Sequence, residues 1–272
     1  LARPLYLGAV GLLLLVLVVG RISEGAQSWI ALGTRTFQPS EVAKLTLIIA
    51  LAAYWQRFEG RTSGWLVQIG GLAIAAVPAL LVLVQPDLGS AIVIGAIWLV
   101  MAWGAGIRAS QLGALAVLAM PVLYVAWTSD ALLDDYQKRR LLSFYYLLTD
   151  PSKADFNDSY NVMQALGAIG QGGWFGAGLT RGLFSQGNYV PVQHTDFIFA
   201  VIGEEMGFVG AVVLISFQAL LLWQALTIAG QARDSFGQLI ALGIFAMLFC
   251  HILVNIGMNL SLLPVTGLPL PL

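Results

Sequence analysis

The chain has 272 residues, of which 58% are hydrophobic and 10% are charged, and its mean hydropathy is +0.83. A soluble globular domain carries about 25% charged residues, so these charges are too few to cover a soluble surface. The net charge of −1 argues against a nucleic-acid-binding protein, and the high hydrophobicity argues against disorder. The single cysteine, Cys250, excludes an internal disulfide. The composition therefore predicts a polytopic membrane protein.

The apolar segments predict an all-α fold, a polytopic transmembrane helix bundle forming one integral-membrane domain over residues 1–272. A bilayer core of ~30 Å needs about 20 apolar residues in a helix. Seven segments meet this requirement, and an eighth is expected to begin near Leu260. Because the chain starts without Met and ends in an apolar stretch, we expect a fragment whose helix count is a lower bound. The seven segments are Arg3–Gly20, Val42–Gln56, Trp65–Val84, Ser90–Ile107, Gln111–Trp127, Phe197–Ala225 and Phe236–Met258.

A long polar segment, residues 129–195, separates the fifth and sixth apolar segments. We interpret it as a large extracytoplasmic loop, since long loops in compact architectures are usually functional. The orientation follows from Lys and Arg in the short connections, which are in excess on the cytoplasmic side. One set of segment ends carries five arginines and the opposite set carries two. The five are Arg3, Arg57, Arg61, Arg108 and Arg233, and the two are Arg21 and Arg35.

Two polar motifs precede apolar segments near the outer side. In Gln38–Lys44, Pro39 suits the first position of a helix, and Glu41 and Lys44 fall three residues apart on one face. The pair is interpreted either as an intrahelical ion pair at a helix start or as an ion pair lining an outward cavity. Asp87, between two apolar segments, is well placed as a helix N-cap.

Asp196 closes the polar segment and opens the sixth apolar segment. Taken alone, this position favours an N-cap role for Asp196. The helix below it presents a face of small residues, Ala200, Gly203, Gly207 and Ala211, which permits close helix contact or a groove for a lipid chain. Asp196 would then lie at the outer mouth of that groove. Glu204, deeper in the same helix, is expected to be a buried structural partner.

The polar segment contains two further motifs. Lys138, Arg139 and Arg140 form a basic triplet that suits either an anionic ligand or the membrane surface. The glycine run from Gly167 to Gly178 lacks the ending of a P-loop. It is interpreted as a helix-breaking turn, or as a source of backbone N–H groups for a phosphate.

The order of the motifs closely resembles the SEDS family (shape, elongation, division and sporulation), and within it RodA more than FtsW. The resemblance covers essentially the whole chain and implies ten transmembrane helices with cytoplasmic termini, of which seven to eight are expected here. The motifs are Gly25-Ala-Gln-Ser-Trp29, Gln38-Pro-Ser-Glu-Val-Ala-Lys44, Gln85-Pro-Asp-Leu-Gly89, Tyr136-Gln-Lys-Arg-Arg140, His194-Thr-Asp-Phe-Ile-Phe-Ala-Val-Ile-Gly-Glu-Glu205 and Leu263-Pro-Val-Thr-Gly-Leu-Pro-Leu-Pro271.

The resemblance implies a peptidoglycan glycosyltransferase of cell elongation and shape. It would polymerise lipid II, an undecaprenyl-diphosphate-linked disaccharide-peptide, on the outer side of the bacterial cytoplasmic (inner) membrane, beside a class B penicillin-binding protein. Undecaprenyl tails would lie in grooves under the small-residue face. No organic cofactor and no nucleic acid is expected, and membrane lipids surround the protein.

Within that reading Asp196 is the expected general base, and cations stabilise the lipid diphosphate that leaves. A divalent cation, magnesium or manganese, held partly by a carboxylate, is compatible with this role. The expected substrate-binding residues are Glu41, Lys44, Asp87, Lys138, Arg139, Arg140 and His194.

Two alternatives stay open: a lipid II flippase and a noncatalytic scaffold of the elongation or division machinery. A flippase needs polar residues and broken helices at the membrane midplane, whereas the charges here gather at one face. The polar residues of the seventh segment, His251, Asn255 and Asn259, are expected to have packing or interhelical hydrogen-bond roles.

Overall fold

The computed structural model describes residues 1–23, 26–32, 35–128, 135–150, 156–187, 189–190, 192 and 194–271. The motif residues Gly25, Pro191 and Gln193 lie outside the described residues. The chain divides into two compact units. The first unit is Leu1–Asp135 with Gln224–Met247, and the second is Tyr136–Trp223 with Leu248–Leu272. Each unit is described by itself.

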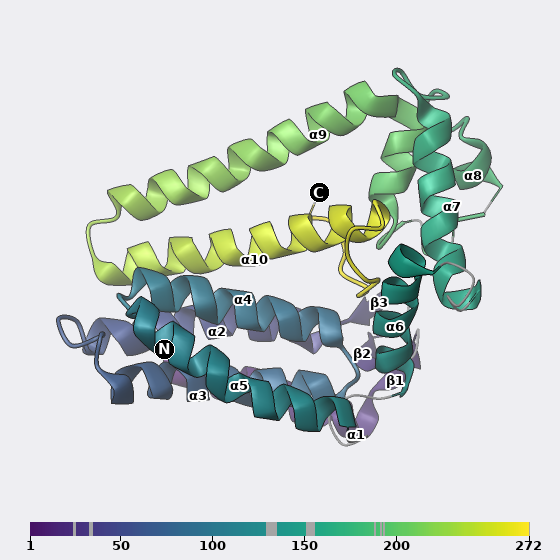
Figure 1. The fold of residues 1–272 in the computed structure, drawn as a ribbon. Helices are drawn as coiled ribbons and strands as arrows, with labels where there is room; N and C mark the ends of the chain where they lie inside the picture. The colour runs from purple at the N-terminus through teal and green to yellow at the C-terminus, as the bar shows by residue number, and fades with distance from the viewer. Residues whose placement is uncertain are drawn as a thin grey trace. The chain divides into compact units, whose positions relative to one another are not determined.

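The first unit contains five apolar helices, which Figure 1 colours from purple to teal: α1 (Ala2–Val19), α2 (Pro39–Arg57), α3 (Trp65–Val84), α4 (Leu88–Gly104) and α5 (Ala109–Thr128). Helix α2 packs against α1, α3 and α4. As expected, Pro39 is the first helical residue, where its missing N–H costs no hydrogen bond. Prediction and structure differ by a few residues at the ends of these helices.

Between α1 and α2 the chain forms a small antiparallel sheet that an all-α fold did not anticipate. The strands are β1 (Arg21–Ser23), β2 (Ala26–Leu32) and β3 (Arg35–Phe37), in the order β1-β2-β3. They are short and contain polar residues, so hydrophobic periodicity gave little signal for them. The pairing satisfies backbone groups that the connection would otherwise leave exposed.

The second unit contains helices within the segment 129–195, which the sequence indicated only as a loop. These are α6 (Asp135–Thr149, of which Asp135 belongs to the first unit), α7 (Phe156–Gly172) and the short α8 (Leu183–Gln186). Two long helices, α9 (Ile198–Gln231) and α10 (Ser235–Asn259), pass from one unit into the other. The expected eighth apolar helix is absent, because Leu260–Pro271 is not helical and carries three prolines.

Among the described residues, four helices are long and apolar enough to cross a membrane: α3, α5, α9 and α10. The apolar stretches in α1 and α4 are somewhat shorter. Large apolar side chains such as Phe217, Leu220 and Trp223 on α9 are exposed, which suits contact with lipid. All seven apolar segments predicted from the sequence are therefore helices.

Helix α9 is interrupted at Gly207, where the backbone has φ 68° and ψ −166°. Figure 1 shows its ribbon changing direction beside α7. The turn after α7 pairs with both sides of the break. Ala177 N–H donates to Glu204 O (2.9 Å), and Phe208 N–H donates to Gly173 O (2.8 Å). The peptide groups released by the break are thereby satisfied within the protein.

This close approach corrects the expectation of a lipid groove under the small-residue face. A Cβ on Gly203 would lie 3.1 Å from Ile169, and one on Gly207 would lie 2.7 Å from Phe175 N. Gly203 and Gly207 therefore serve close backbone contact with the end of α7 and the turn that follows it. The glycine run is a helix-ending turn, as one interpretation had it. Its amides at Ala177 and Gly178 bond α9 carbonyls.

Candidate functional site

The sequence-predicted site residues fall in both units. Glu41, Lys44 and Asp87 belong to the first unit. His194, Asp196 and the basic triplet belong to the second. The two groups are therefore examined one after the other.

In the first unit, the N-termini of α2 and α4 are joined by hydrogen bonds. Asp87 is the N-cap of α4, and its Oδ1 accepts from Ser90 N–H at 2.9 Å, so the predicted capping role is confirmed. Gln38, the N-cap residue of α2, donates from Nε2 to Asp87 Oδ2 at 3.0 Å. One carboxylate oxygen of Asp87 thus caps α4, and the other links the starts of α2 and α4.

The predicted ion pair is present one turn into α2. Lys44 Nζ lies 2.7 Å from Glu41 Oε1, and the Lys44 side chain is 0% exposed whereas that of Glu41 is 43% exposed. A buried ammonium requires a nearby anion, because desolvation of an unpaired charge costs several kcal/mol. Glu41 supplies that charge and fixes the direction of the lysine.

In the second unit, two asparagines of α10 hold the backbone at Asp196. Asn255 Nδ2 and Asn259 Nδ2 donate to Asp196 O at 2.9 and 3.0 Å. Asn259 Oδ1 also accepts from Ala200 N–H at 3.0 Å, a capping contact at the third residue of α9. Asp196 lies two residues before α9 and is buried. The expected interhelical role of the asparagines is therefore confirmed.

The C-terminal segment Leu263–Leu270 lies against this same turn. Asn255 Nδ2 donates to Leu268 O at 2.8 Å, and His251 Nδ1 lies 3.1 Å from Pro269 O. Gly267 has φ 75°, and a Cβ built on it would lie 3.6 Å from Asp196 Oδ2. The segment therefore runs beside the Asp196 carboxylate, in a left-handed conformation that favours glycine.

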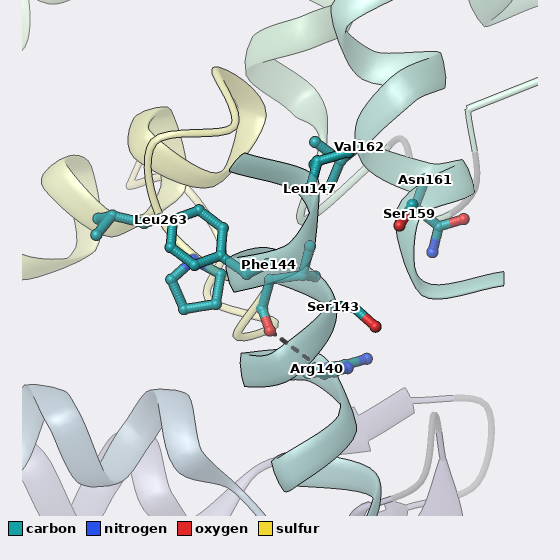
Figure 2. Close-up of a pocket in the computed structure, with 10 residues that line it drawn as sticks. Arg140, Ser143, Phe144, Leu147, Ser159, Asn161, Val162 and Leu263 are labelled. Carbon is teal, nitrogen blue, oxygen red and sulfur yellow. Dashed lines mark hydrogen bonds between the residues drawn. The ribbon is translucent and has the colours of Figure 1, made fainter. Parts of the chain in front are cut away.

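A cavity of about 60 Å³ lies in the second unit, between α6, the start of α7 and the C-terminal segment. Figure 2 shows the residues that line it. Its lining is Arg140, Ser143, Phe144, Leu147, Ser159, Asn161, Val162, Leu263, Pro264 and Val265. Arg140 donates from a guanidinium nitrogen to Val265 O at 3.4 Å. Of the basic triplet, only Arg140 lines this cavity. Arg139 is exposed and Lys138 is half-buried.

Two other candidates have different environments. His194 is exposed on the turn before Asp196. Glu204 is completely buried, and its two oxygens accept from Phe184 N–H (2.7 Å) and Ser185 N–H (2.9 Å). Glu204 therefore fixes the start of α8, which confirms its expected structural role.

The described residues contain no group of three or more His, Cys, Asp or Glu side chains that could hold a metal ion. The described residues of the cavity lining, which include an arginine and no carboxylate, also repel a cation. The described surroundings do not fit a metal site.

Sequence reasoning missed two buried hydroxyls near the C-terminal segment. Ser159 Oγ, in the cavity lining, and Thr266 Oγ1, beside Gly267, have no hydrogen-bond partner among the described residues. Serine and threonine are common, and nothing in their local sequence separates these two from others. Only the packing of α6, α7 and the C-terminal segment reveals them.

The comparisons with known proteins extend over the whole chain. Residues 1–272 match the family model described as "Cell cycle protein", of FtsW, RodA and SpoVE. Peptidoglycan glycosyltransferase MrdB of Escherichia coli K12 is 38% identical over 273 residues, covering 100% of this chain and 71% of that protein. A probable peptidoglycan glycosyltransferase FtsW of Idiomarina loihiensis is 39% identical over 280 residues, covering 99% of this chain and 64% of that protein.

Solved structures are also similar to the whole chain. A chain from a peptidoglycan synthase complex that coordinates polymerization and crosslinking has a TM-score of 0.78 and 36% identity, covering 100% of this chain and 74% of that chain. The rod shape determining protein RodA of Thermus thermophilus has a TM-score of 0.64 and 31% identity, covering 100% and 70%. With its apolar helices, its motifs and these matches, the chain belongs to the FtsW/RodA/SpoVE (SEDS) family of integral membrane proteins.

Proposed function

We propose that this protein is a peptidoglycan glycosyltransferase that joins lipid II units into glycan strands for cell elongation and shape. The observation that carries the proposal is the clamped Asp196 turn: Asn255 and Asn259 hold the backbone carbonyl of the buried Asp196, whose carboxylate lies beside the C-terminal segment. The activity named for the relatives MrdB and FtsW supports the same reaction class. A clamped backbone suits catalysis, since a reacting group must hold its position within a fraction of an ångström.

In this proposal Asp196 is the general base. The acceptor hydroxyl gives its proton to the Asp196 carboxylate as its oxygen attacks the anomeric carbon of the donor. The bond from that carbon to the lipid diphosphate breaks, and the electron pair leaves with the diphosphate. A single displacement on an α-linked donor gives a β-linkage, so one base suffices and no covalent intermediate forms. Lys44, Arg139 and Arg140 are the candidate cations for the leaving diphosphate, and Lys138 is a further proposed substrate contact.

The proposal also covers location and partner. The arginine distribution supports an active site on the outer side of the cytoplasmic membrane. The likeness to a chain of a synthase complex that couples polymerization with crosslinking supports a class B penicillin-binding protein as partner. His194, Asp87 and Glu41 remain proposed substrate contacts, with Glu41 acting through the orientation of Lys44. A divalent cation, magnesium or manganese, would have to arrive with the substrate.

The test compares Asp196→Asn with the parent in the full-length protein, purified with its partner and supplied with lipid II. Loss of a general base lowers the rate by about 10²–10⁴-fold. Asp234→Asn is the matched control, because Asp234 caps the start of α10 by accepting from Gly237 N–H (3.1 Å) and asparagine caps equally well. A folded Asp196→Asn protein that gives the parental polymer yield would contradict the assignment of Asp196 as general base.

One observation favours the flippase as a second candidate. Helix α9 is broken at Gly207, about 14 Å along the helix from its first residue at 1.5 Å per residue, and transporters use broken helices near the midplane. The break here is covered, however, because residues 173–178 bond its peptide groups. Movement of labelled lipid II across liposomes by Asp196→Asn, without polymer, favours the flippase.

A further inference from the structure

The polar part of the cavity lining in Figure 2 favours anions and lies beside an apolar part. Among the residues that the structure describes, Arg140 is the charged member of the lining, and none of the described lining residues is a carboxylate. The planar guanidinium matches phosphate oxygens in a bidentate geometry. The hydrogen bond from Arg140 to Val265 O fixes the side chain against the C-terminal segment. A volume of about 60 Å³ has room for several water-sized groups, and hence for a phosphoryl group with its oxygens.

Ser159 provides a second, independent indication of a ligand. The residue is 6% exposed, and its Oγ has no hydrogen-bond partner among the described residues. Figure 2 shows its oxygen on the side of α7 that faces α6 and Arg140. Buried hydroxyls are almost always hydrogen-bonded, so one that lines a polar cavity points to a partner supplied from outside the chain. A serine hydroxyl donates readily to a phosphate oxygen.

A short stretch of the C-terminal segment connects the cavity to the Asp196 carboxylate. Val265 lines the cavity, and Gly267, two residues on, lies beside Asp196 Oδ2. Two residues of extended chain span at most about 7 Å. Thr266, between them, contributes the other buried hydroxyl without a partner among the described residues. The carboxylate and the cavity thus flank one short stretch of backbone.

This spacing fits the two sides of an inverting displacement. The acceptor oxygen and the leaving oxygen lie on opposite sides of the anomeric carbon, so a base and a phosphate subsite must be separated by several ångströms. We propose that the cavity binds a phosphoryl group of the donor's lipid diphosphate, with Arg140 and Ser159 as its ligands. The acceptor then approaches from the side of Asp196. This inference rests on the proposed function.

The atoms balance in this arrangement. The acceptor proton goes to Asp196, the new bond forms between the acceptor oxygen and the anomeric carbon, and the glycosyl–phosphate bond breaks. The electron pair passes to the diphosphate oxygen, whose added negative charge faces Arg140 and the Ser159 hydroxyl. Ser159 acts on the leaving group, and Asp196 acts on the nucleophile.

Binding is tested directly on the full-length protein in nanodiscs, by calorimetric titration with undecaprenyl diphosphate and with inorganic diphosphate. Hydrogen bonds to charged groups are strong enough for Ser159→Ala to weaken binding of both probes about tenfold. Arg140→Gln weakens it at least as much. Ser159→Thr, which keeps the hydroxyl, stays within about threefold of the parent.

Two variants of the second unit serve as controls. Ser216→Ala removes an exposed hydroxyl of α9, and Arg181→Gln removes an exposed guanidinium that does not line the cavity. Both keep parental affinity for the two probes. Parental affinity in folded Ser159→Ala and Arg140→Gln proteins overturns the inference. Equal competition by phosphatidylglycerol vesicles also overturns it, because the cavity then holds lipid headgroups in general.

A parallel polymerisation assay separates the two proposals. If the parent polymerises lipid II and diphosphate affinity is unchanged in Ser159→Ala and Arg140→Gln, the assignment of the subsite is wrong and the proposed function stands. If the parent makes no polymer but its diphosphate affinity falls in both variants, the phosphate subsite stands. The glycosyltransferase and the assignment of the subsite to its donor are then wrong.

Discussion

The break in α9 gives the sharpest structural prediction, the effect of Gly207→Ala. The backbone at Gly207 has φ 68° and ψ −166°, a region open almost only to glycine, and occupying it with alanine costs about 1–3 kcal/mol. The new Cβ would also overlap Gly176 N and lie 2.7 Å from Phe175 N. These are backbone atoms, so relief requires the whole turn to move.

Moving that turn breaks hydrogen bonds on both sides of the helix break. The shift would affect two hydrogen bonds most. Phe208 N–H donates to Gly173 O (2.8 Å), and Val209 N–H donates to Trp174 O (3.1 Å). Each lost bond costs about 1 kcal/mol, and more where the group stays buried. The sum is roughly 3–6 kcal/mol, which corresponds to a fall in melting temperature on the order of 10 °C.

The assay is thermal unfolding of the detergent-purified protein, with Gly170→Ala as the control. Gly170 lies within α7, and a Cβ there meets no atom within 4 Å. The helix propensity of alanine then stabilises α7 by about 0.5–1 kcal/mol. The two glycine-to-alanine changes should therefore have opposite signs. A melting temperature of Gly207→Ala at or above that of Gly170→Ala would refute the argument from backbone geometry.

Three further substitutions test the buried polar contacts by the same unfolding measurement. Glu204→Gln replaces one of two accepting oxygens by a donor and should cost about 2–4 kcal/mol. Glu205 accepts from the Ser185 hydroxyl at 3.1 Å, and Glu205→Gln, which keeps an acceptor, should cost less than about 1 kcal/mol; equal losses contradict the capping role. Glu41→Gln removes the carboxylate that pairs with the buried Lys44 and should cost about 1–3 kcal/mol, between exposed and buried ion pairs; Lys44→Met should cost less, and the reverse order contradicts the pairing argument. Asn259→Ala removes the amide that holds the start of α9 and should cost about 2–4 kcal/mol, with polymerisation falling in parallel; an unchanged melting temperature rules out the clamp.

Local sequence was sufficient for the features that depend on neighbours in the chain. An apolar run of membrane length forms a helix wherever it lies, because its backbone groups must bond within the segment. The Glu41–Lys44 pair and the Asp87 cap depend on a spacing of three residues, so both were predictable. The family followed from the order of the motifs, and the whole-chain match confirmed it. Orientation and the catalytic role of Asp196 stay predictions.

The tertiary structure decided what depends on distant segments. Asn259 reaches Asp196, 63 residues away in sequence, and Arg140 reaches Val265, 125 residues away. Helix α9 can break at Gly207 because the glycine-rich turn after α7 supplies hydrogen bonds to the peptide groups at the break. No periodicity within α9 indicates this contact. The sequence thus determined which residues have polar side chains near the ends of the apolar helices. Packing of helices far apart in the chain determined which of them share a cavity, because a hydrogen bond depends on distance in space rather than along the chain.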